Sequence, residues 1–270
     1  MQFAAINGVT LHFQVIGAAK DKPVLVFSNS LGTDFRIWRD VIMQFVGDYA
    51  IVAYDKRGHG LSDVGTSPYT MDDHIDDLAG LLDHLQVTNA VICGLSVGGM
   101  IAQGLAMSRP DLVRALVLCD TGHKIGTEEL WTERIAAVEA NGIVAISDAI
   151  LERWFSAAFR KPDNADFAGY RNMLTRTTVA GYAGTGAAIR ATDYTDRVGA
   201  IEVPTLCVVG EEDRATPPQL VKELAGLIPG AKFEMIAGAG HLPCIEQADR
   251  LVDIMKAFLA QIPKTGGDDV

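Results

Sequence analysis

The sequence contains no long apolar run and no cluster of basic residues. No stretch reaches the roughly 18 consecutive apolar residues that a membrane-spanning helix needs, so we predict no transmembrane segment. Lysine and arginine number 23 against 34 aspartates and glutamates, which gives a formal net charge of −11. We therefore expect neither nucleic acid nor a membrane as a partner. An anionic small molecule stays compatible with this acidity, because one arginine can dominate the field inside a pocket.

Cysteine is also scarce, and it follows no metal-binding pattern. The four cysteines, Cys93, Cys119, Cys207 and Cys244, are far apart, and three of them lie in or beside apolar runs. Free cysteine in such surroundings behaves as a small buried hydrophobe, which favours a reduced, intracellular protein. Residues 1–13 lack the basic and long apolar segments of a signal peptide. We expect a cytoplasmic protein with no metal and no other cofactor.

Short apolar runs alternate with segments of helical periodicity along most of the chain. The apolar runs, typical of strands buried on both faces, are residues 23–29, 50–55, 90–94, 115–120, 204–210 and 231–238. The segments with helical periodicity are residues 34–46, 71–86, 98–108, 217–227 and 246–262. An Asn7-Gly8 turn predicts a hairpin over residues 1–16. This order predicts an α/β fold with a mostly parallel sheet and helices on both faces.

The alternation is interrupted once, between residues 122 and 198. This stretch contains no strand-like run, and three segments in it are amphipathic: residues 127–140, 143–159 and 163–190. We interpret it as a helical insertion between two strands. The chain is then divided into a core, residues 1–121 and 199–270, and a helical cap, residues 122–198.

Gly94-Leu95-Ser96-Val97-Gly98 has the pattern G-x-S-x-G between an expected strand and an expected helix. In this context the pattern predicts a nucleophile elbow, in which Ser96 projects from a tight strand-to-helix turn. The flanking glycines fit because side chains there would clash across the turn. The plain alternative is a glycine-rich turn, and a phosphate-binding loop is excluded because no Lys-Ser/Thr pair follows.

A serine nucleophile needs a histidine base and an acid that orients the base, in the chain order Ser, acid, His. Only His123 and His241 follow Ser96, and His241 lies in a glycine-rich loop after the last expected strand. We therefore expect His241 to be the base. Asp213 and Asp120 both follow strands and compete for the position of the acid. We favour Asp213, because its strand immediately precedes the one that leads to His241.

An oxyanion hole needs two backbone N–H groups near the nucleophile. One is expected from Val97, the residue after the serine. The other is expected from the loop at residues 28–32, where Leu31 is the candidate donor.

Residues 54–63, YDKRGHGLSD, form a further tight turn. We expect Asp55 and Arg57 to make structural ion pairs there. We expect no direct chemistry from His59.

Four motifs together resemble those of the α/β-hydrolase superfamily. They are G-L-S-V-G-G at 94–99, Y-D-x-R-G-x-G-x-S at 54–62, V-P-T-L-x-V-V-G-x-x-D at 203–213 and G-x-G-H at 238–241. The resemblance implies an α/β-hydrolase fold: an eight-stranded, mostly parallel sheet with a helical cap over the site, which matches the insertion at 122–198.

The loop SNSLGTD at 28–34 and the run at 131–159 are similar to bacterial 3-oxoadipate enol-lactonases. This narrower resemblance implies hydrolysis of 3-oxoadipate enol-lactone, a small lactone that bears a carboxylate, in the β-ketoadipate pathway of aromatic degradation. The reaction would use Ser96, His241 and Asp213 and pass through an acyl-enzyme.

A carboxylate on the substrate requires a cation in the pocket. Two arginines on the expected cap helices, Arg134 and Arg153, have tryptophan neighbours. We expect Trp131, Arg134 and Trp154 to line the pocket. A carboxylesterase, a cofactor-free perhydrolase and a ligand receptor on the same fold stay open as alternatives. The oligomeric state stays open too, with a homo-oligomer among the options.

Overall fold

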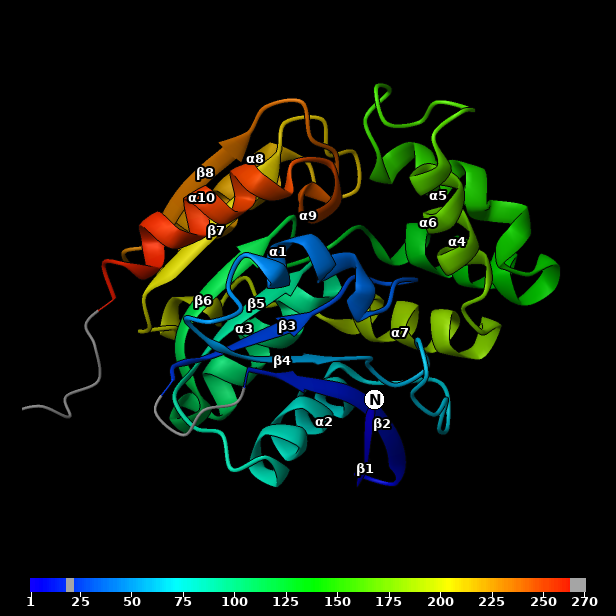
Figure 1. Ribbon diagram of the computed structural model, residues 1–270. Coiled ribbons are helices and arrows are strands. Elements are labelled where there is room, and N and C mark those ends of the chain that lie inside the picture. The colour runs from blue at the N-terminus through cyan, green and yellow to red at the C-terminus, as the bar shows by residue number, and fades with distance from the viewer. Residues whose placement is uncertain (18–21, 263–270) are drawn as a thin grey trace, which may run out of the picture.

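A computed structural model of the protein describes residues 1–17 and 22–262. These residues form an eight-stranded sheet in the order β1-β2-β4-β3-β5-β6-β7-β8 (Figure 1). The strands are β1 (Gln2–Ile6), β2 (Val9–Ile16), β3 (Val24–Ser28), β4 (Ala50–Tyr54), β5 (Ala90–Leu95), β6 (Val113–Cys119), β7 (Thr205–Gly210) and β8 (Lys232–Ile236). β2 is antiparallel to both β1 and β4, and every other pair is parallel. The predicted eight-stranded, mostly parallel sheet is confirmed.

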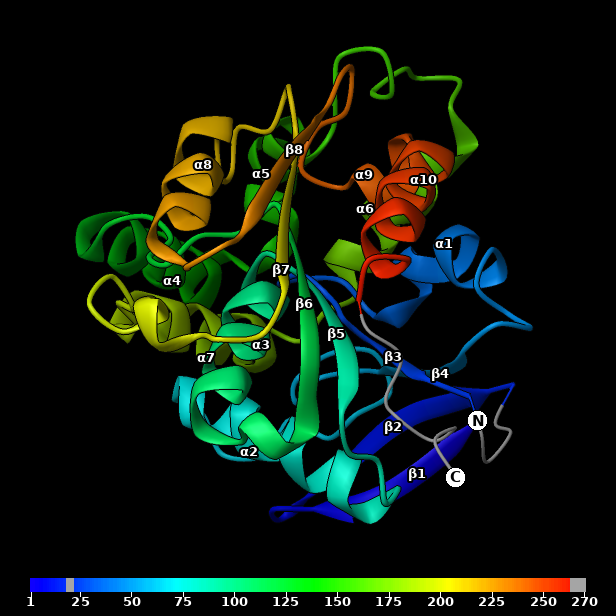
Figure 2. The same cartoon turned by 90° about the vertical axis from the view of Figure 1, so that its left-hand side faces the viewer.

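Helices cover both faces of this sheet (Figure 2). The α-helices are α1 (Arg39–Met43), α2 (Met71–His84), α3 (Val97–Ser108), α4 (Glu128–Asn141), α5 (Ser147–Trp154), α6 (Ala165–Thr175), α7 (Val179–Ala191), α8 (Pro218–Leu227), α9 (Pro243–Glu246) and α10 (Ala248–Leu259). α1 and α10 lie on one face, and α2, α3 and α8 lie on the other. All residues of β4, β5 and β7 are buried, which explains why their sequences are continuous apolar runs.

The N-terminal hairpin forms around the predicted turn. Asn7 and Gly8 both have positive φ angles, 46° and 78°, as a two-residue turn of the hairpin-favoured type requires. The strands then pair in register from Ile6 with Val9 to Gln2 with Phe13.

Three helical predictions need correction. Residues 34–46 form a short 3₁₀ turn, Phe35–Trp38, followed by the five-residue α1. Residues 246–262 contain only the last residue of α9 and then α10, and a non-helical backbone at Gln247 (φ −141°, ψ 47°) separates the two helices. The segment at 163–190 is two helices, because the Thr178 side chain accepts a hydrogen bond from Gly181 N and so begins α7 as a new helix.

Helices α4 to α7 lie between β6 and β7 in the sequence and gather at one end of the sheet (Figure 1). α4 packs against α7, and α5 packs against α6. The division into a core and a cap at 122–198 stays a prediction. In the described part of the chain, no helix combines the length and the apolar character that crossing a membrane requires.

Candidate active site

Ser96 lies in the sharp turn between β5 and α3, with backbone angles that few non-glycine residues adopt (φ 57°, ψ −120°). Two hydrogen bonds fix this turn against the end of β6. Ser96 N donates to Cys119 O (3.0 Å), and Thr121 Oγ1 donates to Ser96 O (2.6 Å). The strand, turn and helix that the G-x-S-x-G pattern predicts are therefore present.

Both glycines of the pattern are required by close backbone contacts. A Cβ atom on Gly94 would lie 2.3 Å from Gly98 O, which agrees with the predicted clash across the turn. A Cβ atom on Gly98 would instead lie 2.2 Å from Ser28 O, at the end of β3. The second glycine thus makes room for the neighbouring strand, a contact that the sequence pattern does not indicate.

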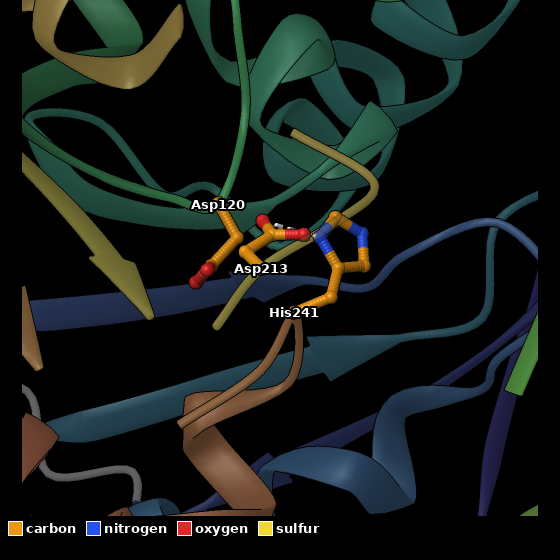
Figure 3. Close-up of side chains that lie close together, drawn as sticks. All are labelled: Asp120, Asp213 and His241. Carbon is orange, nitrogen blue, oxygen red and sulfur yellow. Dashed lines mark hydrogen bonds and ion pairs between the residues drawn. The ribbon is translucent and has the colours of Figure 1, made fainter. Parts of the chain in front are cut away.

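His241 and Asp213 form a buried pair (Figure 3). His241 Nδ1 lies 2.8 Å from Asp213 Oδ2 and 3.3 Å from Thr216 Oγ1. Asp213 has three further donors: Ala215 N (2.7 Å) and Thr216 N (3.1 Å) donate to Oδ1, and Thr216 Oγ1 donates to Oδ2 (2.6 Å). His241 N donates to Trp154 O (2.8 Å), which ties the histidine loop to the end of α5.

The hydrogen bonds of Asp213 determine its charge. Burial by itself raises the pKa of a carboxyl group, but the His241 imidazole and the Thr216 donors outweigh burial and lower the pKa of Asp213. Asp213 is therefore ionised at neutral pH and accepts a hydrogen bond from Nδ1–H of His241. His241 then keeps a lone pair on Nε2, the atom that a general base uses.

Asp120, the other candidate acid, has a different partner. Its Oδ1 accepts a hydrogen bond from Gly210 N at the end of β7 (2.8 Å), and no described residue donates to its Oδ2. Asp213 lies between Asp120 and the imidazole of His241 (Figure 3). Burial and the charge of Asp213 raise the pKa of Asp120 well above its usual range, which favours its neutral form. Of the two carboxyl groups, Asp213 is the ionised one bonded to the histidine.

Among the described residues, Asp120, Asp213 and His241 are also the one group of three or more His, Cys, Asp or Glu residues whose ligand atoms all lie within 4.8 Å of one another. Their contacts fit a hydrogen-bonded pair better than a metal site. Asp213 and His241 share a proton at hydrogen-bond distance, and backbone N–H groups already bind one oxygen of each carboxyl group. A metal would have to displace that proton and bind at about 2.0–2.2 Å.

A cavity of about 510 Å³, its open mouth included, joins Ser96 to His241. On its other side the wall comes from α4, α5 and α7. The cavity-lining residues of these helices include Trp131, Arg134, Arg153, Trp154 and Tyr182. The three residues predicted from the expected cap helices therefore reach the same cavity as the serine and the histidine.

Two of these lining residues, Arg134 and Arg153, are partly buried cations. Neither forms an ion pair with any residue that the structure describes. Arg134 lies over the ring of Trp131, 5.2 Å from its centroid. Burial and the charge of Arg134 lower the pKa of Arg153. Arg153 is missing from the predicted lining set, although its place directly before Trp154 is a signal for it.

The two expected oxyanion donors are both close to Ser96. Leu31 lines the cavity, and Val97 is the first residue of α3, where N–H groups have no partner within the helix. Within the described chain, neither Leu31 N nor Val97 N donates a hydrogen bond. Both N–H groups are therefore available to a negatively charged oxygen.

Comparison with known proteins gives the family. The profile of the alpha/beta hydrolase fold matches residues 23–248. The chain belongs to the α/β-hydrolase family. It is 34% identical over 257 residues to 3-oxoadipate enol-lactonase 1 of Acinetobacter baylyi, with 95% of each chain covered. It is 32% identical over 251 residues to 3-oxoadipate enol-lactonase 2 of the same organism, with 93% of each chain covered.

Among solved structures, this α/β hydrolase is similar to the enol-lactonase from Burkholderia xenovorans LB400. The TM-score is 0.93 at 35% sequence identity, and the match covers 96% of this chain and 100% of the other. The predicted α/β-hydrolase fold is confirmed. The prediction that the protein hydrolyses carboxylic esters is confirmed as well.

Proposed function

We propose that this α/β hydrolase opens the ring of 3-oxoadipate enol-lactone, with Ser96, His241 and Asp213 as its catalytic triad. One observation carries the proposal: the cavity of Ser96 and His241 also contains two arginines that have no ion-pair partner among the described residues. The serine suits a cyclic ester, and the arginines suit a carboxylate on the same small molecule. The relatives named 3-oxoadipate enol-lactonase support this substrate.

In the acylation step, Ser96 Oγ attacks the lactone carbonyl carbon while His241 Nε2 takes the hydroxyl proton. Asp213 stabilises the imidazolium that results. The carbonyl oxygen becomes negatively charged and accepts hydrogen bonds from the N–H groups of Leu31 and Val97. Collapse of this intermediate breaks the ring C–O bond, and His241 returns the proton to the leaving enol oxygen. The enol then becomes a ketone, which opposes closure of the ring.

In the deacylation step, water attacks the acyl group on Ser96. His241 accepts the proton of the water and then returns a proton to Ser96 Oγ as the ester bond breaks. The free product, 3-oxoadipate, carries two carboxylates.

The helices between β6 and β7 supply the selectivity in this proposal, with residues 122–198 as the cap. Arg134 and Arg153 bind the carboxylate of the lactone, and Trp131 and Trp154 provide flat apolar walls. The wall on the sheet side holds the reacting groups, so the two ends of the substrate contact different parts of the chain.

The test compares two esters of different charge. Wild type, S96A, R134A and R153A are assayed with 3-oxoadipate enol-lactone and with the neutral ester p-nitrophenyl acetate. S96A should lose activity on both esters. Each arginine variant should raise KM for the lactone about tenfold or more, since a charged hydrogen bond contributes about 1.5–3 kcal/mol. Neutral ester hydrolysis should stay within about twofold, and R190A, an exposed arginine on α7, is the control.

The other outcomes identify the alternatives. Turnover of the neutral ester alone would refute the lactonase and leave a carboxylesterase. Equal effects of the arginine variants on both esters would refute Arg134 and Arg153 as the carboxylate-binding residues. Peroxide-dependent halogenation without lactone turnover would indicate a perhydrolase. Binding of the lactone without turnover would indicate a receptor. The β-ketoadipate pathway and the cytoplasmic location stay predictions from the sequence.

A further inference from the structure

Lys56 is a buried lysine whose ammonium group contacts carbonyl oxygens. It follows β4, and the residue is 1% exposed. Its Nζ donates to Asn29 O (3.4 Å) and to Ser30 O, both in the loop after β3. Within the described part of the chain, Lys56 forms no ion pair. A buried cation without a direct counter-ion is costly, and the two carbonyl oxygens offset part of that cost.

Ser30 O belongs to the same peptide unit as the N–H of Leu31. In a planar trans peptide unit, the C=O and N–H bonds point in opposite directions. By binding Ser30 O, Lys56 therefore sets the direction of Leu31 N–H. Thr33 supports the same carbonyl, with its N at 3.3 Å and its Oγ1 at 2.9 Å.

The next peptide unit of this loop is held by His59. Gly32 N donates to His59 Nε2 (3.0 Å), and His59 Nδ1 donates to Arg57 O (3.1 Å). Burial and the charge of Lys56 lower the pKa of His59 well below its usual range, so the imidazole is neutral and Nε2 can accept. The turn at 54–63 thus fixes the carbonyl before Leu31 and the amide after it.

We infer that Lys56 is a positioning residue of the oxyanion hole, which fixes the Ser30–Leu31 peptide unit and strengthens Leu31 N–H as a donor. The inference rests on the proposed attack by Ser96. A cation bound to a carbonyl oxygen draws electron density from the peptide unit, so its N–H becomes a better donor. This donor acts most strongly on the charged oxygen of the transition state, and the effect of Lys56 therefore belongs to kcat.

The test uses two variants of Lys56 and one control. K56M removes the charge and the donor, K56Q keeps a neutral donor, and K222M removes an exposed lysine from α8. For K56M we expect kcat to fall about 10- to 100-fold. Deleting an oxyanion donor outright typically lowers kcat about 10²–10³-fold, so the loss in K56M should be smaller. KM should stay within about twofold, because the effect is absent from the ground state. K56Q should fall between wild type and K56M, and K222M should match wild type.

Stability and pH separate this function from a structural one. Burial lowers the pKa of Lys56 to about 7, opposed by the charges of Asp55 and Asp34. His59 and His74, the other titratable groups that face it, have lowered pKa values because of burial and the Lys56 charge. Wild-type kcat should therefore decline as Lys56 loses its proton above about pH 7, and K56M should lack this decline. The Tm of K56M should equal or exceed that of wild type, because a buried charge is gone.

The two substrates separate a failure of this inference from a failure of the proposed function. With p-nitrophenyl acetate, an unchanged kcat in K56M would overturn the inference. A lower kcat would also overturn it if K56M had a lower Tm and the same pH profile as wild type. If K56M does not fold, K56Q decides: wild-type kcat with the alkaline decline intact would overturn the inference. Failure of wild type on the lactone alone, with normal ester turnover, would refute the proposed substrate and leave the Lys56 comparison valid on the ester.

Discussion

The two adjacent carboxyl groups offer a sharp test of the proposed triad, because the same substitution can be made at each. In D213N, the amide oxygen should take the place of Oδ1, which accepts from Ala215 N and Thr216 N. The amide NH₂ group then occupies the place of Oδ2, 2.8 Å from His241 Nδ1. An NH₂ group there can only donate, so Nδ1 must accept, and the imidazole proton moves to Nε2. His241 can then no longer take a proton from Ser96.

The expected loss in D213N is large. A triad with the wrong histidine tautomer loses about 10⁴-fold in kcat, which corresponds to about 5 kcal/mol of transition-state stabilisation. In D120N the amide replaces a carboxyl group whose neutral form is favoured, because burial and Asp213 raise its pKa. Its oxygen can still accept from Gly210 N. We therefore expect kcat of D120N to stay within about threefold of wild type, less than about 1 kcal/mol.

The assay is kcat for p-nitrophenyl acetate and for the lactone, with circular dichroism to show that both variants fold. A D120N loss as large as that of D213N would refute the division of charge between the two carboxyl groups. So would a D213N enzyme that keeps a tenth of wild-type kcat.

Three further predictions concern stability and the elbow. In G98A the new Cβ would lie 2.2 Å from the main-chain oxygen of Ser28, so we expect loss of folded protein or of esterase activity, scored by soluble yield and kcat. D77A removes the carboxylate that binds the buried Arg57 with two N–O distances of 2.7 Å. We expect urea unfolding to show a free energy of unfolding lower by about 3–5 kcal/mol. A change under about 1 kcal/mol would contradict the importance of this ion pair. Because the pKa of Asp120 is raised, its carboxyl group keeps a proton in the folded chain that it releases in the unfolded chain above about pH 4. The contribution of Asp120 to stability is therefore complete below about pH 4 and falls as the pH rises. The difference Tm(D120N) minus Tm(wild type) should therefore become more positive between about pH 5 and pH 8. A difference that does not change with pH would contradict this.

Much of the fold could be predicted from the sequence because buried parallel strands are recognisable one at a time. β4, β5 and β7 are apolar throughout, so each one identifies itself without knowledge of its neighbours. Helix ends are different. The break at Gln247 and the new start at Thr178 depend on backbone angles and a capping contact that periodicity does not report.

Within the candidate site, the residues predicted from chain order line one cavity or contact each other, and their catalytic roles stay a proposal. Contacts between distant segments were not predicted. Ser96, Asp213 and His241 are ordered by the chemistry that the elbow requires. Chain order favours Asp213 over Asp120, and the structure adds the contact that separates them: His241 Nδ1 lies beside Asp213, whereas Asp120 accepts from Gly210 N. Lys56 gives no signal at all: a lysine in a turn is typical of a solvent-exposed side chain.

The hydrogen bond from His241 N to Trp154 O has a consequence for how substrate enters. His241, the proposed general base, and the last residue of α5 are joined through their main chains, and a Cβ atom on Gly240 would lie 2.5 Å from the same Trp154 oxygen. A rigid-body opening of α5 would therefore pull His241 away from Ser96 and separate the members of the proposed triad at each turnover. The loop of His241 and the end of α5 therefore form one fixed part of the cavity wall.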